Sequence, residues 1–376
     1  MSAETITLGC RLNFAESEVL KAHAPDGAIV VNSCAVTNEA VRQTRQAIRR
    51  ARRERPGARI IATGCAVQLD PQAFRAMPEV DEVLLKDFDR PAVAAGFRQR
   101  VRSFVAVQTG CDHRCTFCTI WQARGPSRSL PFEAIRDAVA SELGGGAQEI
   151  VLTGVDITSY EGGLGPLVAR LLAALPGLNR LRLSSLDSVE MDEALFELLP
   201  DQRLLPHFHL SLQAGDDLIL KRMKRRHSRA ESVTLVERIK TVRPDATIGA
   251  DLIAGFPTET EEAALNSLKL LDDCDIIAAH VFPFSPRPNT PAARMPQLER
   301  ELVKARAARL RDTAAKRRSA WLDGLVGTTQ RVLVENSAKG HTDGFAPVFI
   351  AGSKRGDTGL ARITGRTQDT LVGVFA

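Results

Sequence analysis

Three cysteines, Cys111, Cys115 and Cys118, lie close together near the middle of the chain. Thiols held in one short loop either form disulfides or bind metal. The sequence has seven cysteines in 376 residues and starts without a secretory signal pattern, so we expect a reducing compartment that favours metal. Three ligands are one short of a closed zinc site, but they suit a 4Fe–4S cluster with one open iron. The spacing therefore favours an iron–sulfur cluster over zinc or a chance grouping.

The pattern Cys-x3-Cys-x2-Cys, with an aromatic residue before the last cysteine, resembles that of the radical S-adenosylmethionine (SAM) superfamily. Here the aromatic residue is Phe117, a candidate cofactor contact. The resemblance implies that Cys111, Cys115 and Cys118 hold three irons and that SAM chelates the fourth. One electron from such a cluster cleaves SAM to give a 5′-deoxyadenosyl radical, so the protein has to position the cofactor and exclude water.

A second set of cysteines, Cys10, Cys34 and Cys65, follows predicted strands near the N-terminus. Short apolar runs separated by helical stretches predict a parallel sheet, with strands at residues 5–8, 28–31, 59–62 and 82–85. The carboxyl ends of parallel strands share one edge, where ligands bind. We therefore expect these cysteines to meet in space, although free cysteines are also common in protein cores.

The residues around this second set resemble the N-terminal domain of the methylthiotransferases. The matching stretches are residues 8–13 (LGCRLN), 32–38 (NSCAVTN) and 63–65 (TGC). In that family the three cysteines bind a second 4Fe–4S cluster, which is the source or carrier of sulfur. The resemblance thus implies two 4Fe–4S clusters and SAM as cofactors.

The family resemblance also implies a reaction. One SAM methylates a sulfur held on the N-terminal cluster, and the other yields the radical that takes hydrogen from carbon 2 of an adenine, where the methylthio group is then attached. That C–H bond is unactivated, which is why a radical source is needed. Residues 33–38 and 281–288 look most like the branch that acts on threonylcarbamoyladenosine next to the tRNA anticodon. Sister branches modify isopentenyladenosine in tRNA or an aspartate of a ribosomal protein.

Residues 101–319 alternate six strands with helices and predict a partial TIM-like barrel, the fold typical of radical SAM enzymes. Function in such barrels collects at the carboxyl ends of the strands. The candidate SAM contacts at those ends are Thr153, Gly154, Ser184, Gln213 and Phe282. A single glycine or serine after a strand is more often a turn former, so only the set as a whole indicates a cofactor site.

The C-terminal part has a different pattern. A long helix at residues 296–319 is followed by short strands separated by Gly, Lys and Asp, which predict a small antiparallel β-barrel at residues 320–376. This part resembles the TRAM domain, an RNA-binding module of tRNA-modifying enzymes. The predicted fold class is thus α/β in three parts: a cluster-binding domain at residues 1–100, the radical SAM barrel and the TRAM-like barrel.

Two basic segments are candidates for contact with tRNA. Residues 39–55 hold seven arginines and two glutamates, a net charge of +5, with one helix face formed by Arg42, Arg45, Arg49, Arg52 and Arg53. We call residues 221–227 (KRMKRRH) the second basic segment. Both fit the electrostatic footprint of a phosphate backbone. The alternative is a solvated helix face, which is what charge runs usually are.

Four other residues with reactive side chains receive structural interpretations. His207, His209 and His280 flank predicted strands, where histidines are usually packed or hydrogen-bonded. Cys274 stands apart from both sets among acidic neighbours, so we do not expect it to be a ligand.

Composition narrows the remaining choices. The chain contains no apolar run of about 18 residues, so we expect a cytoplasmic protein with no membrane contact. The implied partners are the anticodon stem-loop of tRNA, an electron donor and a sulfur donor. Two other classes remain: a radical SAM enzyme with a different product, and a non-enzymatic RNA-binding protein with structural zinc.

Overall fold

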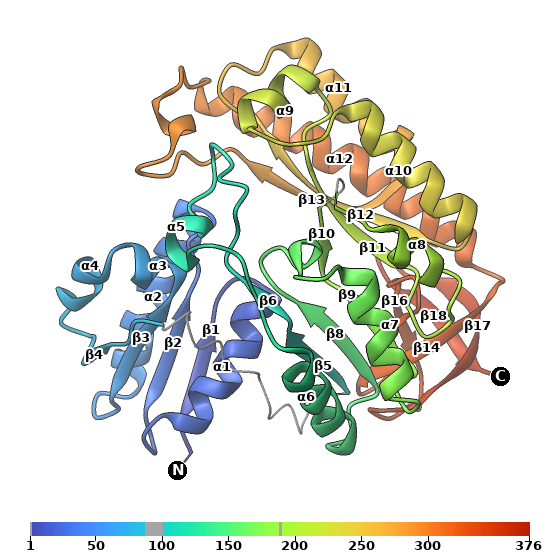
Figure 1. The fold of residues 1–376 in the computed structure, drawn as a ribbon, viewed down its shortest axis with the longest axis horizontal. Helices are drawn as coiled ribbons and strands as arrows, with labels where there is room; N and C mark the ends of the chain where they lie inside the picture. The colour runs from blue at the N-terminus through green and yellow to red at the C-terminus, as the bar shows by residue number, and fades with distance from the viewer. Residues whose placement is uncertain (1, 87–100, 188–189) are drawn as a thin grey trace.

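The computed structural model describes residues 2–86, 101–187 and 190–376. Figure 1 shows an N-terminal parallel sheet beside a larger arrangement of parallel strands with outer helices, and a small C-terminal barrel beneath it. This confirms the predicted α/β fold class and its three parts. The predicted division after residue 100 falls in residues 87–100, outside the described residues, and the domain boundaries remain predictions.

The N-terminal sheet is parallel throughout, with its strands in chain order. Its strands are β1 (Glu4–Thr7), β2 (Ile29–Ser33), β3 (Ile60–Gly64) and β4 (Glu82–Val83). Its helices are α1 (Arg11–His23), α2 (Asn38–Glu54), α3 (Cys65–Leu69) and α4 (Pro71–Arg75). The central strands β2 and β3 are buried along their whole length, as expected for a parallel sheet covered by helices.

The middle part contains two parallel sheets with the orders β5-β8-β9 and β10-β11-β12-β13. The strands are β5 (Arg102–Ala106), β8 (Glu149–Thr153), β9 (Leu181–Leu183), β10 (Ser185–Leu186), β11 (His207–Gln213), β12 (Thr247–Ala254) and β13 (Ile276–Pro283). The helices between them are α6 (Phe132–Gly144), α7 (Leu164–Ala174), α8 (Glu193–Leu198), α9 (Asp217–Met223), α10 (Arg229–Val242) and α11 (Glu261–Asp273). A short ribbon of β6 (Gln108–Thr109) and β7 (Arg128–Ser129), with α5 (Ile120–Arg124), carries the loop that contains Cys111, Cys115 and Cys118, which we call the central cysteine loop.

One of the six strands predicted within residues 101–319, the one at residues 181–185, is divided into β9 and β10. The amide of Ser184 still bonds the carbonyl of Leu152 in β8 at 3.0 Å, whereas Ser185 and Leu186 pair with β11. The chain therefore changes partner at Ser184 and connects the two sheets into one partial barrel.

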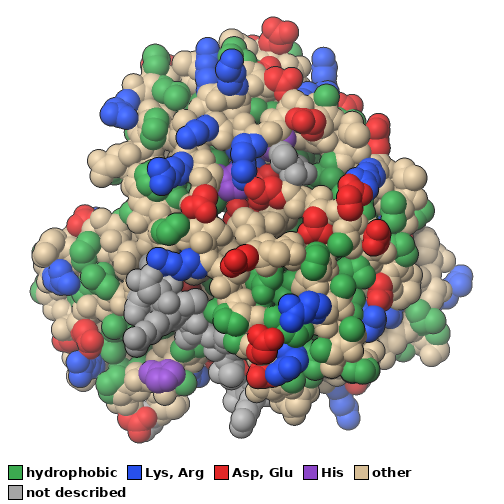
Figure 2. Space-filling view, viewed as in Figure 1, with side chains coloured by type: hydrophobic (Ala, Val, Ile, Leu, Met, Phe, Trp, Pro, Cys, Tyr) green, Lys and Arg blue, Asp and Glu red, His purple; other side chains and the backbone are tan. Residues whose placement is uncertain are grey.

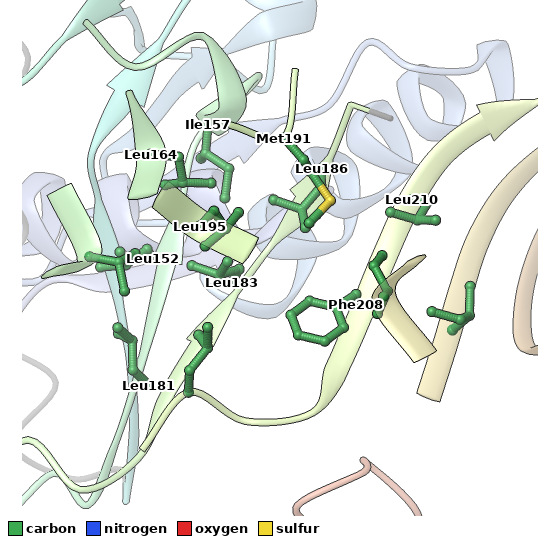
Figure 3. Close-up of a cluster of buried hydrophobic side chains, with 14 of the residues drawn as sticks. Leu152, Ile157, Leu164, Leu181, Leu183, Leu186, Met191, Leu195, Phe208 and Leu210 are labelled. Atoms are coloured by element: carbon green, nitrogen blue, oxygen red, sulfur yellow. The ribbon is translucent and has the colours of Figure 1, made fainter. Parts of the chain in front are cut away.

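A large apolar cluster joins the strands to the outer helices. Figure 3 shows Leu152, Leu183 and Phe208 from neighbouring strands facing Leu164 of α7 and Leu195 of α8. Cys274 is fully buried in the same cluster, and the expectation that it is not a ligand remains a prediction. This packing fixes the strand ends at which the candidate site lies.

The C-terminal part begins with a longer helix than the sequence predicts. Helix α12 (Arg300–Leu325) packs against β13 and continues past residue 319 into the final barrel. That barrel is closed in the order β14-β15-β16-β18-β17, formed by β14 (Thr329–Asn336), β15 (Lys339–Thr342), β16 (Pro347–Ile350), β17 (Thr358–Arg366) and β18 (Leu371–Phe375). Its pairs are antiparallel except β16 with β18, and β15 was not predicted because its sequence, KGHT, has little β-propensity.

A buried ion-pair network holds this small barrel against the larger one. Glu149, at the start of β8, is fully buried and accepts hydrogen bonds from Arg102, Arg180 and Arg182. Burial alone would raise the pKa of Glu149, but the three guanidiniums hold it well below its usual range. Arg180 also pairs with Asp343 of the small barrel. The network lies at the amino ends of the strands, opposite the cysteines.

Among the described residues, no helix has the length and apolar character needed to span a bilayer.

Candidate metal centre

The central cysteine loop, residues 111–118, is fixed by backbone contacts rather than by regular structure. The Thr116 amide donates to the carbonyl of Met223 at 3.1 Å, and its hydroxyl donates to that of Arg222 at 2.8 Å. The Thr116 carbonyl accepts from the amide of Ala292 at 3.0 Å. Two segments far apart in sequence, residues 222–223 and Ala292, therefore hold the loop against the carboxyl end of the barrel.

The thiols of this loop are suited to metal rather than to free chemistry. Burial raises the pKa of Cys111 to about 12, with smaller contributions from Asp156 and the other two cysteines. Burial also raises the pKa of Cys118 to about 11, with Cys115 and Cys65 adding to the rise. Such thiols stay protonated at neutral pH until a metal displaces the proton. A set of three soft donors fits an iron–sulfur cluster with one open iron.

The structure brings the N-terminal cysteines together, as the parallel sheet predicts. Cys10 caps the start of α1, Cys34 follows β2, and Cys65 begins α3 directly after β3. Cys34 and Cys65 are buried, whereas Cys10 is exposed. Burial raises the pKa of Cys34 to about 11, and both Cys10 and Cys65 contribute in the same direction. This second set of three thiols also fits an iron–sulfur cluster.

Two polar side chains tie the three strand ends to one another. The amide of Asn13 donates to the carbonyls of Leu8 at 2.8 Å and Ser33 at 3.0 Å, which joins the ends of β1 and β2. The hydroxyl of Ser33 accepts from the amides of Ala66 and Val67 at 3.1 and 3.2 Å. It thereby caps the first turn of α3 and joins the end of β2 to the helix that Cys65 begins.

Three of the six cysteines directly follow a glycine with positive φ. The φ angles of Gly9, Gly64 and Gly110 are +101°, +99° and +75°. A Cβ at Gly64 would lie 2.4 Å from the amide nitrogen of Ser33, and one at Gly110 only 1.8 Å from the carbonyl oxygen of Pro126. Other residues are strained in this conformation and have no room there, so glycine sets the backbone that presents each following thiol.

The two cysteine sets are neighbours, and Arg124 lies between them. Helix α5, which follows the central loop, contacts α3 of the N-terminal sheet (Figure 1). Arg124 of α5 is 1 % exposed and donates from Nε to the Cys65 sulfur at 3.2 Å. Its other nitrogens donate to Asn13 Oδ1 at 2.7 Å and to both oxygens of Glu16 at 2.7 and 2.9 Å. This role was not predicted, since Arg124 lies outside both cysteine patterns.

One arginine of the second basic segment faces this site, while Lys221, Lys224 and Arg226 are exposed. Arg225 is 6 % exposed, pairs with Asp187, and donates from Nη1 to the Cys115 sulfur at 3.6 Å. Arg226 pairs with Glu190. Figure 2 shows basic, acidic and histidine side chains gathered at the centre of this face. These pairings neutralise part of the charge that the sequence assigned to RNA.

The predicted SAM contacts lie near the carboxyl ends of their strands. Thr153 and Ser184 are buried, Gln213 ends β11 with a φ of +70°, and Phe282 lies near the end of β13 with 36 % exposure. Gly154 follows β8, where a Cβ would contact neighbouring atoms at 2.8 to 2.9 Å. The structure thus places all five along one rim of the barrel, and their contact with SAM remains a prediction.

The aromatic residue of the central loop has a packing role. Phe117 is partly buried and packs against an apolar cluster around α9 and the end of β12, made of Ala214, Ile219, Leu220, Met223, Ile253, Phe256, Ala263 and Ala292. Its ring anchors the loop to the barrel. A contact between Phe117 and the cofactor remains a prediction.

The chain is similar to known proteins over almost its whole length. Residues 105–271 match the Radical SAM superfamily, and residues 3–85 match a family described as Uncharacterized protein family UPF0004. A Rickettsia prowazekii protein named threonylcarbamoyladenosine tRNA methylthiotransferase MtaB is 40 % identical, with 92 % of this chain and 91 % of that protein aligned. The chain belongs to the methylthiotransferase family. A Thermotoga maritima protein of the same name is 32 % identical, with 97 % and 95 % aligned.

Another relative of this methylthiotransferase carries a different name. An Erythrobacter litoralis protein named tRNA-2-methylthio-N(6)-dimethylallyladenosine synthase is 31 % identical, with 89 % of this chain and 86 % of that protein aligned. Among solved structures, the radical SAM methyltransferase TsrM from Kitasatospora setae, with cobalamin and a 4Fe–4S cluster bound, superposes with a TM-score of 0.54. It is 15 % identical and covers 75 % of this chain and 68 % of its own, which supports the fold.

One residue of this methylthiotransferase that links the loop to the barrel rim was not found from the sequence. Gln108, at the start of β6, donates to the carbonyl of Gly110 at 2.8 Å. Its amide oxygen accepts from the backbone nitrogens of Val155 and Asp156 at 3.1 and 2.9 Å. It therefore fixes the cysteine loop relative to the turn that contains Gly154. A glutamine after a strand is too common to signal this role.

The histidines of the methylthiotransferase barrel are hydrogen-bonded, as expected. His207 Nδ1 lies 2.9 Å from the hydroxyl of Thr247. His209 Nε2 and His280 Nδ1 lie 2.9 and 3.2 Å from the same oxygen of Asp251. These contacts cross three neighbouring strands and fix the inner face of the barrel.

Proposed function

We propose that this methylthiotransferase converts N6-threonylcarbamoyladenosine, next to the anticodon of tRNA, to its 2-methylthio derivative by radical SAM chemistry. The observation that carries the proposal is the meeting of two three-thiol sets: α5, which follows the central loop, packs on α3, and Arg124 of α5 donates to the Cys65 sulfur at 3.2 Å. The choice of threonylcarbamoyladenosine as the substrate nucleoside rests on the names of the relatives. Those at 40 %, 34 % and 32 % identity are all called threonylcarbamoyladenosine tRNA methylthiotransferase.

In this proposal each thiol set holds one cluster. Cys111, Cys115 and Cys118 hold the 4Fe–4S cluster that binds SAM, and the set of Cys10, Cys34 and Cys65 holds the second. When bound, the clusters and SAM supply the one-electron chemistry and the sulfur that replace the hydrogen on carbon 2 of the adenine. Two clusters need two separate sets of thiols that open toward one substrate, which accounts for the packing of α5 on α3.

The barrel rim binds and orients SAM. The hydroxyls of Thr153 and Ser184 and the amide of Gln213 offer hydrogen bonds to its polar groups, and Gly154 allows close backbone approach. Phe282 and Phe117 supply apolar surface that excludes water from the reacting atoms. Gln108 and Thr116 position the central loop without touching the cofactor.

The partners follow from the reaction. The substrate is the anticodon stem-loop of tRNA, whose base is splayed out of the loop to reach the site. Reduction needs an electron donor, and repeated turnover needs a sulfur donor to reload the second cluster. A tRNA substrate also places the reaction in the cytoplasm.

The test is mass spectrometry of tRNA nucleosides. The gene is expressed in a bacterial strain that lacks its own tRNA methylthiotransferases, and the bulk tRNA is digested and analysed. We expect the 2-methylthio derivative of threonylcarbamoyladenosine, and none in cells carrying the Cys10→Ala variant. A 2-methylthio derivative of isopentenyladenosine instead would assign the chain to the function named for the Erythrobacter litoralis relative.

A further inference from the structure

A groove of about 820 Å³ lies between the N-terminal sheet and the barrel. Helix α2 forms one wall, and residues 287–289, which follow β13, form the other. Ala66 and Thr119 also line the groove, and each directly follows a cysteine of a different set. The groove therefore lies one residue from both cysteine sets, and it has the volume of a small-molecule or nucleotide site.

The lining of the groove is strongly positive. Its residues include four arginines, Arg42, Arg45, Arg49 and Arg287, and one acidic residue, Asp70. The carboxylate of Asp70 is engaged locally, because it caps the start of α4. A cleft lined by one sign of charge concentrates ligands of the opposite sign.

Two of these arginines have polar atoms that lack a protein acceptor. The Nε–H groups of Arg45 and Arg287 are buried and have no hydrogen-bond partner among the residues that the structure describes. Arg287 is 6 % exposed in total, and Arg45 is held with its guanidinium over the ring of Phe74, 5.7 Å from the centroid. Buried donors nearly always have a partner, so two unsatisfied Nε–H groups in the lining of one groove indicate an acceptor that the described residues do not provide.

Other arginines of α2 differ from these two because they pair with carboxylates. Arg50, outside the groove, pairs with Glu54 at 2.7 Å. Arg42 and Arg49, which also line the groove, pair with Glu39 at 2.6 Å and with Glu79 at 3.7 Å. The exposed face of α2 is thus partly neutralised by its own carboxylates. Arg45 and Arg287 line the groove without a carboxylate partner for the Nε–H group among the described residues.

The groove is also a fixed feature of the domain junction. Asn38, the first residue of α2, donates from its side chain to the carbonyl of Pro286 at 3.0 Å and from its backbone to the hydroxyl of Ser285 at 3.3 Å. Its side-chain oxygen accepts from Arg287. The amino end of α2, which carries a partial positive charge, therefore opens at the junction beside Arg287.

We propose that this groove binds a backbone phosphate of the tRNA anticodon loop, with Arg45 and Arg287 as its anchors. Guanidinium groups bind phosphate oxygens with two parallel N–H bonds, and in both residues the Nε donor of that fork is unsatisfied. The proposal deepens the proposed function, on which it rests. A strand held here lies next to the residues that follow Cys65 and Cys118, so the contact positions the loop beside both cysteine sets.

The test compares three charge-removing substitutions in the reconstituted holoenzyme. Arg45→Gln and Arg287→Gln remove the two anchors, and Arg53→Gln removes an exposed charge from the same helix outside the groove. Binding of an anticodon stem-loop RNA is measured by fluorescence anisotropy over a range of salt concentrations. Iron content is measured first, and Arg45→Gln serves alone if the largely buried Arg287 is needed for folding.

We expect Arg45→Gln and Arg287→Gln each to weaken RNA binding roughly tenfold, the loss of one charge-assisted contact. Each should also reduce the slope of log K against log salt by about 0.7, the value for one phosphate on a single strand. Arg53→Gln should change the affinity less than twofold and leave the slope unchanged. Equal effects of all three substitutions would show diffuse attraction and overturn the groove assignment.

A second arm identifies the phosphate. One neutral methylphosphonate linkage is placed in turn at each position of the loop, and at one position it should weaken binding to the wild type but not to Arg45→Gln. Inorganic phosphate at matched ionic strength should not displace the RNA. Displacement that Arg45→Gln abolishes would assign the groove to free phosphate instead. Failure of the wild type to bind RNA would contradict the proposed function itself, whereas normal binding by the groove variants would contradict the groove alone.

Discussion

The two cysteine sets reach similar arrangements by different routes. The central set occupies one loop of eight residues, so the spacing of Cys111, Cys115 and Cys118 along the chain is enough to bring the three thiols together. The N-terminal set comes from three loops spread over residues 10–65, which only the parallel order of β1, β2 and β3 brings together. The central set is therefore visible as a motif, whereas the N-terminal set is a property of the sheet.

This difference decides what each set depends on. The central loop is fixed by contacts with the barrel, chiefly through Thr116 and Gln108. The N-terminal set is fixed by Asn13 and Ser33, which join the ends of the strands. A substitution that breaks the contacts of one set should therefore leave the other set able to bind its cluster, and the iron content of a single variant reports on both sets.

The largest effect is expected from removing one thiol of either set. Cys34→Ala and Cys115→Ala should each abolish the methylthio product, because the proposed reaction needs both clusters. Each should also lower the iron content from roughly eight to roughly four atoms per chain. A set that has lost one of its three thiols should no longer hold its cluster, while the other set keeps its own. Iron analysis and nucleoside mass spectrometry check the two outcomes. The variants should differ in SAM cleavage under dithionite, which Cys34→Ala retains and Cys115→Ala loses.

The control for this pair is Cys274→Ala. Cys274 is buried in the barrel core, far from both patterns in sequence, so its removal should leave the iron content unchanged. If Cys34→Ala lost all eight irons, the two sets would not assemble independently and the comparison would fail.

The second effect concerns the glycines that precede the cysteines. Gly64→Ala should prevent the N-terminal set from holding its cluster, because the new methyl group would overlap the backbone of Ser33. Gly110→Ala should do the same to the central set, through overlap with Pro126. We expect each to destabilise its part of the protein by about 4 kcal/mol, at the upper end of single substitutions. Iron content and the thermal unfolding midpoint measure the change.

Gly125→Ala is the matched control for both. Gly125 also has a positive φ, +73°, but no atom lies within 4 Å of the position that a Cβ would take. Its cost should be the strain of that conformation alone, about 1 to 3 kcal/mol. A cost at Gly125 equal to that at Gly64 would show that conformation, and not lack of space, selects these glycines.

The parts of the molecule that the sequence predicts are those with local or periodic signals. The buried runs that form β2 and β3 are continuous and apolar, so both the strands and the position of Cys34 and Cys65 at their ends could be predicted. The division of the strand at Ser184 could not, because it depends on which neighbour each residue pairs with. Strand β15 was missed for the related reason that closure of the small barrel, not propensity, makes it a strand.

The contacts of charged residues are the part of the site that is hardest to predict from the sequence. The second basic segment has the same composition as an RNA-binding surface, yet Arg225 is buried and directed at Cys115. Arg124 stands in no motif, yet it links α5, the helix after the central loop, to Cys65 of the N-terminal set. Whether a guanidinium contacts a carboxylate, a thiol or solvent depends on residues about 40 to 110 positions away in the chain. A run of basic residues therefore predicts attraction for negative charge, but it does not identify the group that is bound.

The smallest expected effect is a change in the reduction potential of each cluster when the arginine beside it is replaced. Arg124 donates to a sulfur of the N-terminal set and Arg225 to a sulfur of the central set. A positive donor near a cluster stabilises its reduced form, so Arg124→Met should lower the reduction potential of the N-terminal cluster, and Arg225→Met that of the central one, by on the order of tens of millivolts. Electron paramagnetic resonance during a redox titration measures both clusters at once. The lysine variants keep the charge and should shift the potential less. If Arg124→Met shifted both clusters equally, Arg124 would act through the common field of the junction, and the two sets would be electrostatically one site.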